Sequence, residues 1–149
     1  MGESLKRYYP NILVGLQFGI IGLMIIFADG FFSSFYPLLI FIIGLGVGIW
    51  ALRHNQLDNF YIQPKLKKHA KLITSGIYRY IRHPMYLSVI IMMFSMVIAS
   101  FSILEMSLFL GLIVVLWLKA KREESLWCMC DDRYIDYKKK TKFFLPFIL

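Results

Sequence analysis

Four apolar runs divide this chain of 149 residues, and they constrain its fold more than any other feature of the sequence. The runs are Ile12–Ala28, Phe35–Leu52, Met85–Ser100 and Phe101–Leu118. Each run is close to the lower length limit for a helix that crosses a bilayer, which is roughly 20 residues. Because 58% of the residues are hydrophobic and the mean hydropathy is +0.62, we expect a single polytopic membrane domain over residues 1–149.

The basic residues indicate how the runs cross the membrane. All 17 Lys and Arg residues fall in three blocks, at residues 6–7, 53–82 and 119–142. Lys and Arg are retained on the cytoplasmic side, so an even number of crossings must separate one block from the next. The last two runs therefore form a hairpin rather than one over-long helix. The predicted fold is all-α, with about four transmembrane helices, both termini cytoplasmic, a first helix pair at residues 1–58 and a core at residues 59–149.

Two further patterns concern helix packing and the C-terminal part of the chain. Gly44 and Gly48 are four residues apart and share a helix face, which is typical of close helix packing. A backbone surface that lets a cofactor approach Gly44 or Gly46 is the alternative. No Gly or Pro interrupts residues 112–142, so we expect the fourth helix to continue past the membrane as a cytoplasmic C-terminal helix. Residues 141–149 are expected to fold back against the bilayer or the site.

Composition also bears on other classes of protein. The net charge of +8 is explained by the cytoplasmic bias of basic residues and by attraction to anionic headgroups, so no nucleic-acid partner is expected. Cys128 and Cys130 point in different directions on a helix, which predicts reduced thiols and no metal site. The first run is too long for a typical signal-peptide core, so no cleavable signal is predicted. A small transporter would need ionisable residues at mid-membrane depth, and the interiors of the runs are uncharged.

A polar corner precedes the third apolar run, within residues Gly76–Tyr86. Pro84 is suited to the first turn of a helix, which places His83 near the N-cap. The helix start and the planar cation of Arg82 together form a seat for a carboxylate. The alternative is that Arg82 and Arg79 contact phospholipid phosphates while His83 caps the helix.

Aromatic and acidic residues complete this candidate site. The faces of Tyr78, Tyr80 and Tyr86 attract cations such as sulfonium groups, although an interfacial aromatic belt is the alternative. Glu123 and Glu124 follow the fourth run and could accept hydrogen bonds from an ammonium group or from ribose hydroxyls. The alternative is a solvated helix surface on which Lys119 pairs with Glu123. If the last two runs form a hairpin, Glu123 and Glu124 return to the membrane face where the Arg82-His83 corner lies. A carboxylate seat, aromatic rings for a cation and a carboxylate pair for an ammonium group together match S-adenosyl-L-methionine.

These residues carry a resemblance to a known family. The stretch Leu72–Tyr86, the pair Glu123-Glu124, and Tyr134 and Tyr137 before residues 143–146 resemble the integral-membrane isoprenylcysteine carboxyl methyltransferases. The chain is similar also to the related phospholipid N-methyltransferases. The resemblance covers roughly Asn59 to Leu149. Two departures are Ser88, where the family often has glycine, and the atypical stretch Cys128–Asp132.

The resemblance implies a methyltransferase that uses S-adenosyl-L-methionine and releases S-adenosyl-L-homocysteine. It implies a cytoplasm-facing pocket built by the last two spans, the segment before them and the C-terminal helix. The cofactor-binding residues carried over are Gly76, Tyr78, His83, Pro84, Tyr86, Glu123 and Glu124. Arg82 and Glu124 are the catalytic candidates, with Arg82 orienting cofactor or substrate, and Tyr137 is a looser candidate.

The methyl acceptor is expected to be a lipophilic molecule that enters from the bilayer of the cell (inner) membrane. The expected acceptor is an isoprenylcysteine-type carboxylate or a related small lipid or isoprenoid. A carboxylate needs no general base, because it is already ionised near neutral pH. A phospholipid amine is the alternative acceptor, and a non-enzymatic transporter or lipid-binding scaffold is the rival of a different class. The sequence leaves the acceptor and the oligomeric state open.

Overall fold

The computed structural model describes residues 3–55 and 71–144, with side chains from residue 8 onward. This part of the chain is all-helical, as predicted. Its helices are α1 (Glu3–Phe27), α2 (Phe35–Asn55), α3 (Pro84–Ser100), α4 (Ile103–Cys130) and α5 (Arg133–Lys140), with two short 3-10 helices, η1 (Phe31–Ser33) and η3 (Gly76–Arg79). An isolated β-bridge between Ile81 and Lys142 is the only strand-like pairing in these residues.

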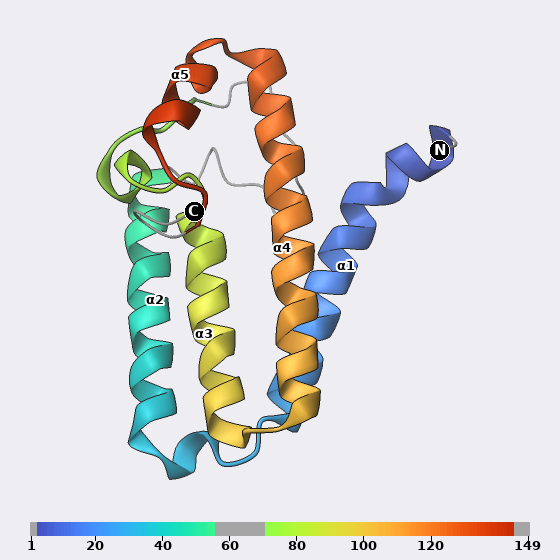
Figure 1. Ribbon diagram of the computed structural model, residues 1–149, viewed down its shortest axis with the longest axis vertical. Coiled ribbons are helices and arrows are strands. Elements are labelled where there is room, and N and C mark those ends of the chain that lie inside the picture. Colours follow the sequence, from blue (N-terminus) through green and yellow to red (C-terminus); the bar gives the residue numbers. More distant parts are fainter. Residues whose placement is uncertain (1–2, 56–70, 145–149) are drawn as a thin grey trace.

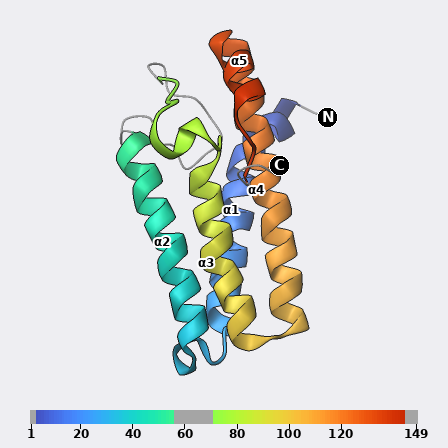
Figure 2. The same cartoon turned by 60° about the vertical axis from the view of Figure 1, so that its left-hand side comes forward.

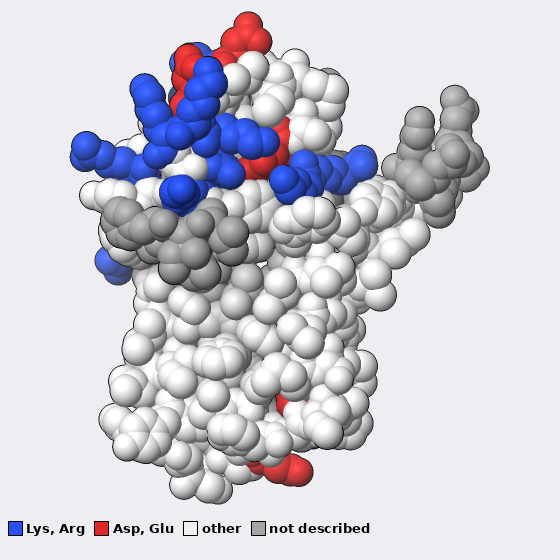
Figure 3. Space-filling model, in the orientation of Figure 1, with Lys and Arg blue, Asp and Glu red and all other residues white. Residues whose placement is uncertain are grey.

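The apolar helices lie side by side, and the described Lys and Arg side chains lie at one end of them. Three of them are long and apolar enough to cross a membrane: the Tyr8–Phe27 part of α1, then α2, then α4. The apolar α3 is shorter, with 17 residues. Figure 3 shows Lys and Arg gathered at one end of the molecule, above a long flank without Lys or Arg on which a few acidic atoms appear near the opposite end. Large hydrophobic side chains are exposed along this flank, which suits a lipid environment.

The last two apolar helices form the predicted hairpin. α3 ends at Ser100, and Phe101 adopts a left-handed backbone conformation with φ 46°. The hydroxyl of Ser102 then accepts a hydrogen bond of 3.1 Å from the Leu104 amide and caps the start of α4. Figures 1 and 2 show α3 between α2 and α4, with α1 packed on α4.

Two hydrophobic clusters hold the helices together. The larger one joins α1, α3 and α4 through Met24, Met93, Leu112 and Leu116. The smaller one lies nearer the charged end and contains Ala51, Ile77, Tyr78, Ile81 and Leu87. Because it packs residues 77–81 against α2 and α3, the smaller cluster positions the segment that leads into the candidate site.

The glycines of α2 allow close contact with α3. A Cβ at Gly44 would lie 2.8 Å from Met92 Cγ and 2.9 Å from the Met92 amide nitrogen, and one at Gly48 would lie 2.6 Å from Ser88 Oγ. The Ser88 hydroxyl donates a 2.8 Å hydrogen bond to the Gly44 carbonyl. Close packing is therefore confirmed at Gly44 and Gly48, and Ser88 uses its hydroxyl within this contact. Gly46 faces open space.

This packing predicts different effects for two matched substitutions. Gly44→Ala should destabilise the protein by about 1–3 kcal/mol, because its methyl group meets backbone that cannot move aside cheaply. Gly46→Ala should leave stability unchanged or raise it by up to about 1 kcal/mol, through better helix propensity. Thermal unfolding of both variants in detergent measures the difference. Equal melting temperatures would contradict the close approach of α2 and α3.

Candidate functional site

The start of α3 is held by a segment from the other end of the chain. Pro84 is the first residue of α3 and His83 is its N-cap, as predicted. The Arg82 and His83 amides donate to the carbonyls of Lys142 (2.8 Å) and Phe143 (3.3 Å), and the Lys142 amide donates to Tyr80 (2.9 Å). Residues 141–144, here called the C-terminal segment, therefore fold back against the site as expected. Residues 145–149 lie outside the described residues.

The end of α4 meets the start of α3 through Glu124. Arg82 Nε donates to Glu124 Oε1 at 2.6 Å, and Lys138 Nζ of α5 lies 2.8 Å from Glu124 Oε2. His83 Nε2 is 3.5 Å from Glu124 Oε1. The carboxylate is 2% exposed, so these contacts replace water around a buried charge. The structure thus brings together the two stretches that sequence analysis placed on one face.

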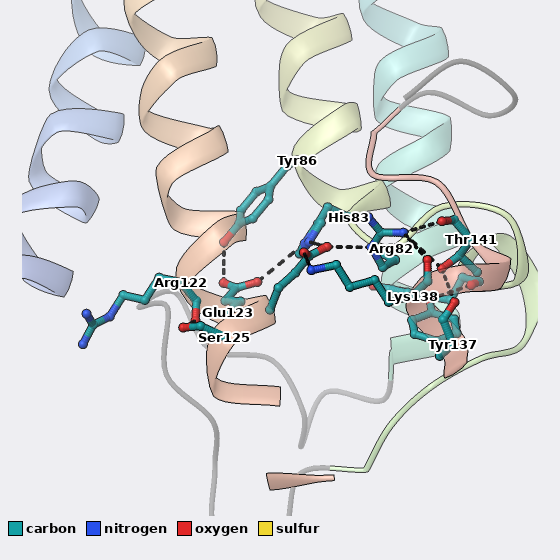
Figure 4. A network of polar contacts seen from close by, with 11 residues as sticks. Arg82, His83, Tyr86, Arg122, Glu123, Ser125, Tyr137, Lys138 and Thr141 are labelled. Atoms are coloured by element: carbon teal, nitrogen blue, oxygen red, sulfur yellow. Dashed lines mark hydrogen bonds and ion pairs between the residues drawn. The ribbon is translucent and has the colours of Figure 1, made fainter. Parts of the chain in front are cut away.

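Glu123 makes the second set of contacts. Its Oε1 accepts a 2.5 Å hydrogen bond from the Tyr86 hydroxyl, and its Oε2 lies 3.7 Å from His83 Nδ1. The His83 ring is stacked on Tyr86, with ring centroids 5.7 Å apart. Each nitrogen of His83 therefore faces one of the two glutamates. Arg82, His83, Tyr86, Glu123 and Glu124 are called the polar cluster below (Figure 4).

Arg82 was predicted to offer its guanidinium to the carboxylate of a ligand, but in the structure the guanidinium is occupied by groups of the protein. Besides Glu124, its guanidinium contacts the Lys138 carbonyl at 3.1 Å and the Thr141 hydroxyl at 3.4 Å, and it also donates to the Thr141 carbonyl. The carboxylate that Arg82 holds in this conformation belongs to the protein. Sequence analysis missed Lys138 and Thr141, because a run of basic residues gives no sign of which one turns inward.

Aromatic rings cover the polar cluster. Phe143 and Phe144 lie 5.0 Å and 6.0 Å from the His83 ring. These rings lie next to cations: the Arg82 guanidinium is 5.6 Å and the Lys121 ammonium 5.4 Å from the Phe143 centroid. Aromatic faces in this position stabilise positive charge when water is excluded.

Tyr78 and Tyr137 connect α5 to the segment before α3. The Tyr137 hydroxyl donates a 2.6 Å hydrogen bond to the Tyr78 carbonyl. Burial raises the pKa of Tyr78, and nearby Tyr137 and Glu123 raise it further. Burial likewise raises the pKa of Tyr137. Both phenols are therefore neutral at physiological pH, and Tyr137 acts as a hydrogen-bond donor.

A groove lies beside the polar cluster, between α5 and the segment before α3. Its volume is about 510 Å³, within the usual range of about 300–1,000 Å³ for small-molecule sites. Its lining residues are Leu72, Thr74, Arg79, Arg133, Asp136, Tyr137, Lys140 and Thr141. Thr141 also contacts Arg82, so the groove and the polar cluster share a wall.

Gly76 lies against the end of α2. Its φ of +59° is in the left-handed region, and a Cβ there would come within 2.3 Å of the His54 ring. Both features require glycine. The predicted turn at Gly76 is confirmed, and its cofactor role stays a prediction.

The comparison with protein families adds to this geometry. A family model described as phospholipid methyltransferase matches residues 32–129. The chain belongs to the phospholipid methyltransferase family. The match extends further upstream than the resemblance noted from Asn59 onward, so it includes α2, and it ends before α5. Both Arg82-His83 and Glu123-Glu124 lie inside it. A search among curated proteins found no match.

Family membership and the apolar helices together characterise the protein. It is an integral membrane methyltransferase, in the group that contains both the phospholipid and the isoprenylcysteine enzymes. The transporter and scaffold alternatives are therefore set aside.

The ion pair between Arg82 and Glu124 predicts a stability difference between two arginine variants. Arg82→Met should destabilise the protein by about 3 kcal/mol, because it leaves a buried carboxylate without its closest partner. Lys138 and His83 remain beside Glu124, which keeps the loss at the low end of the range for buried pairs. Arg133→Met removes an exposed arginine from the pair with Asp131 and should leave the melting temperature unchanged. Similar melting temperatures for both variants would contradict the importance of the buried pair.

Proposed function

We propose that the protein transfers a methyl group from S-adenosyl-L-methionine to a lipid acceptor, with the cofactor bound at the polar cluster. The observation that carries this proposal is the meeting of His83 and Tyr86 with Glu123 at the charged end of α3 and α4. Family membership supports methyl transfer as the reaction. The polar cluster supports the cofactor, because it contains carboxylates, an imidazole and a tyrosine that can contact it.

The residues present fit this cofactor. Glu123 and Glu124 can accept hydrogen bonds from an ammonium group or from ribose hydroxyls. His83 Nε2 is buried and faces Glu124 Oε1 at 3.5 Å without a well-aligned hydrogen bond, so a ligand could supply one. The Phe143 ring already lies near the Arg82 guanidinium and the Lys121 ammonium, and a ring of this kind would suit a sulfonium.

When bound, S-adenosyl-L-methionine supplies a methyl group that is already activated, and S-adenosyl-L-homocysteine is the product. The protein then has mainly to align donor and acceptor and to exclude water, which can contribute on the order of 7–11 kcal/mol. His83, Tyr86 and Glu123 would contact the cofactor. Arg82 and Glu124 would hold the start of α3 against α4, while Phe143 would exclude water.

We assign Gly76, Tyr78 and Pro84 to the cofactor site on the resemblance alone. Pro84 sets the start of α3, where backbone amides and the helix dipole favour an anionic group. Tyr78 belongs to η3 and packs in the smaller hydrophobic cluster with Ala51 of α2. The neighbouring groove, with a volume of about 510 Å³, could hold part of the cofactor, and its lining residue Thr141 contacts Arg82 of the polar cluster.

Two acceptor chemistries remain in the proposal. A lipid carboxylate would be methylated without loss of a proton. A lipid amine must release a proton, and His83 beside Glu123 could accept it. The family description favours a phospholipid acceptor. The two products can be told apart, because mild alkali releases the methyl group from a methyl ester and leaves an N-methyl group in place.

We also infer that the charged end faces the cytoplasm, because it gathers the basic residues. The native cysteines test this orientation: Cys130 is exposed and Cys128 half-buried, both near the end of α4, and the chain contains no others. A membrane-impermeant maleimide should leave intact cells unlabelled and should label Cys130 after permeabilisation. Labelling of intact cells would contradict the orientation.

Calorimetry with S-adenosyl-L-homocysteine tests the cofactor site. Purified native protein should bind it, and His83→Ala and Glu123→Gln should each weaken binding at least about tenfold, as expected for lost hydrogen bonds to charged groups. Asp29→Asn, which removes a carboxylate from the turn after α1, should bind like the native protein. Absence of native binding, or unchanged affinity in both site variants, would reject the site.

A further inference from the structure

A buried lysine lies next to the polar cluster and has no role in the function proposed above. Lys119 of α4 is 2% exposed, and its Nζ donates a 2.5 Å hydrogen bond to Gln17 Oε1 of α1. Gln17 is also buried, at 7% exposed. Lysines near the end of a membrane helix usually extend their ammonium groups toward water. An ammonium directed inward among apolar helices is costly and usually indicates a functional site.

The position of Lys119 relates it to the proposed chemistry. It precedes Glu123 by one helical turn, on the side nearer the apolar part of α4. Its ammonium lies 5.4 Å from the centroid of Tyr86, the residue whose hydroxyl donates to Glu123. A molecule that reaches the polar cluster from the bilayer side would meet this ammonium first.

Gln17 is a partner that a ligand could replace. Its amide oxygen is neutral, so Gln17 itself adds no counter-charge to the ammonium. The acidic neighbour that interacts electrostatically with Lys119 is Glu123, one turn further along α4. It lies on α1, which is outside the family match at residues 32–129 and inclines away from α4 toward its N-terminal end (Figure 1). An anionic oxygen in the place of Gln17 Oε1 would make the stronger, charge-assisted bond.

We propose that Lys119, with Gln17, forms the subsite that binds the anionic group of a lipid as it enters between α1 and α4. The group is a phosphate or a carboxylate carried on an apolar chain. The inference rests on the proposed function, since it places this group beside the methyl-transfer site. Lys119 is a positioning residue: it holds the lipid one turn below Glu123 without contacting the reacting atoms.

Lipid retention in detergent, measured by native mass spectrometry, tests the subsite without knowledge of the acceptor. The native protein should retain dioleoylphosphatidic acid about tenfold more than uncharged dioleoylglycerol, because the charged group gains the Lys119 contact. A second pair, oleate against oleyl alcohol, separates a carboxylate preference from a phosphate preference. Lys119→Met should remove the preference, and Lys119→Arg should keep most of it.

Two further variants separate the subsite from a structural contact. Gln17→Glu keeps Lys119 but supplies a resident carboxylate, so it should also abolish the preference for an anionic lipid. Lys139→Met removes an exposed lysine of α5 and should retain the native preference. If Lys119→Met and Gln17→Glu keep the native preference, or the native protein has none, the inference is wrong and the pair only joins α1 to α4.

The affinity for S-adenosyl-L-homocysteine, measured on the same samples, distinguishes the two proposals. Lys119→Met should bind it like the native protein, because Lys119 is assigned to the lipid. Loss of lipid preference together with unchanged affinity supports the subsite. A native protein that prefers anionic lipid but fails to bind S-adenosyl-L-homocysteine would overturn the cofactor site and leave the lipid subsite standing.

Discussion

The buried ion pair between Arg82 and Glu124 is the contact on which the rest of the site depends. It joins residues that are 42 positions apart, and it does so at 2.6 Å with both side chains nearly excluded from water. The guanidinium of Arg82 also reaches α5 and the C-terminal segment, through Lys138 and Thr141. One side chain therefore fixes the start of α3, the end of α4 and the segment that covers them.

The polar cluster lies at the charged end of the apolar helices, and this position relates it to the membrane. The apolar helices pack through close backbone approach and a buried hydrogen bond, as Gly44 and Ser88 show. Charged groups are less costly where water and headgroups can reach them. The polar cluster lies at that boundary. In the proposed function, a water-soluble cofactor would approach the cluster from the charged end and a lipid from the apolar side. Lys119 and Gln17 extend the same polar connection toward the bilayer and bring α1 into it.

Much of this architecture is readable in the sequence because simple constraints act on it. The blocks of basic residues predict the α3–α4 hairpin, Pro84 predicts where α3 begins, and the hairpin then predicts that Glu124 returns to His83. The contacts that were missed depend on tertiary geometry. Arg82 was expected to hold a ligand carboxylate but holds Glu124, and nothing in a basic run marks Lys138 as the residue that turns inward. Gln17 is visible as a polar residue within an apolar run, yet its partner on α4 depends on how α1 packs.

Photolabelling with methyl-tritiated S-adenosyl-L-methionine tests the central claim most directly. Ultraviolet irradiation of the purified protein, followed by digestion and peptide mapping, locates the residues next to the bound cofactor. The account predicts label in peptides from residues 76–86 or 119–144, and loss of that label in excess S-adenosyl-L-homocysteine. Label confined to α2 or to the turns at residues 28–34 and 100–102, or label that excess product fails to reduce, would contradict it.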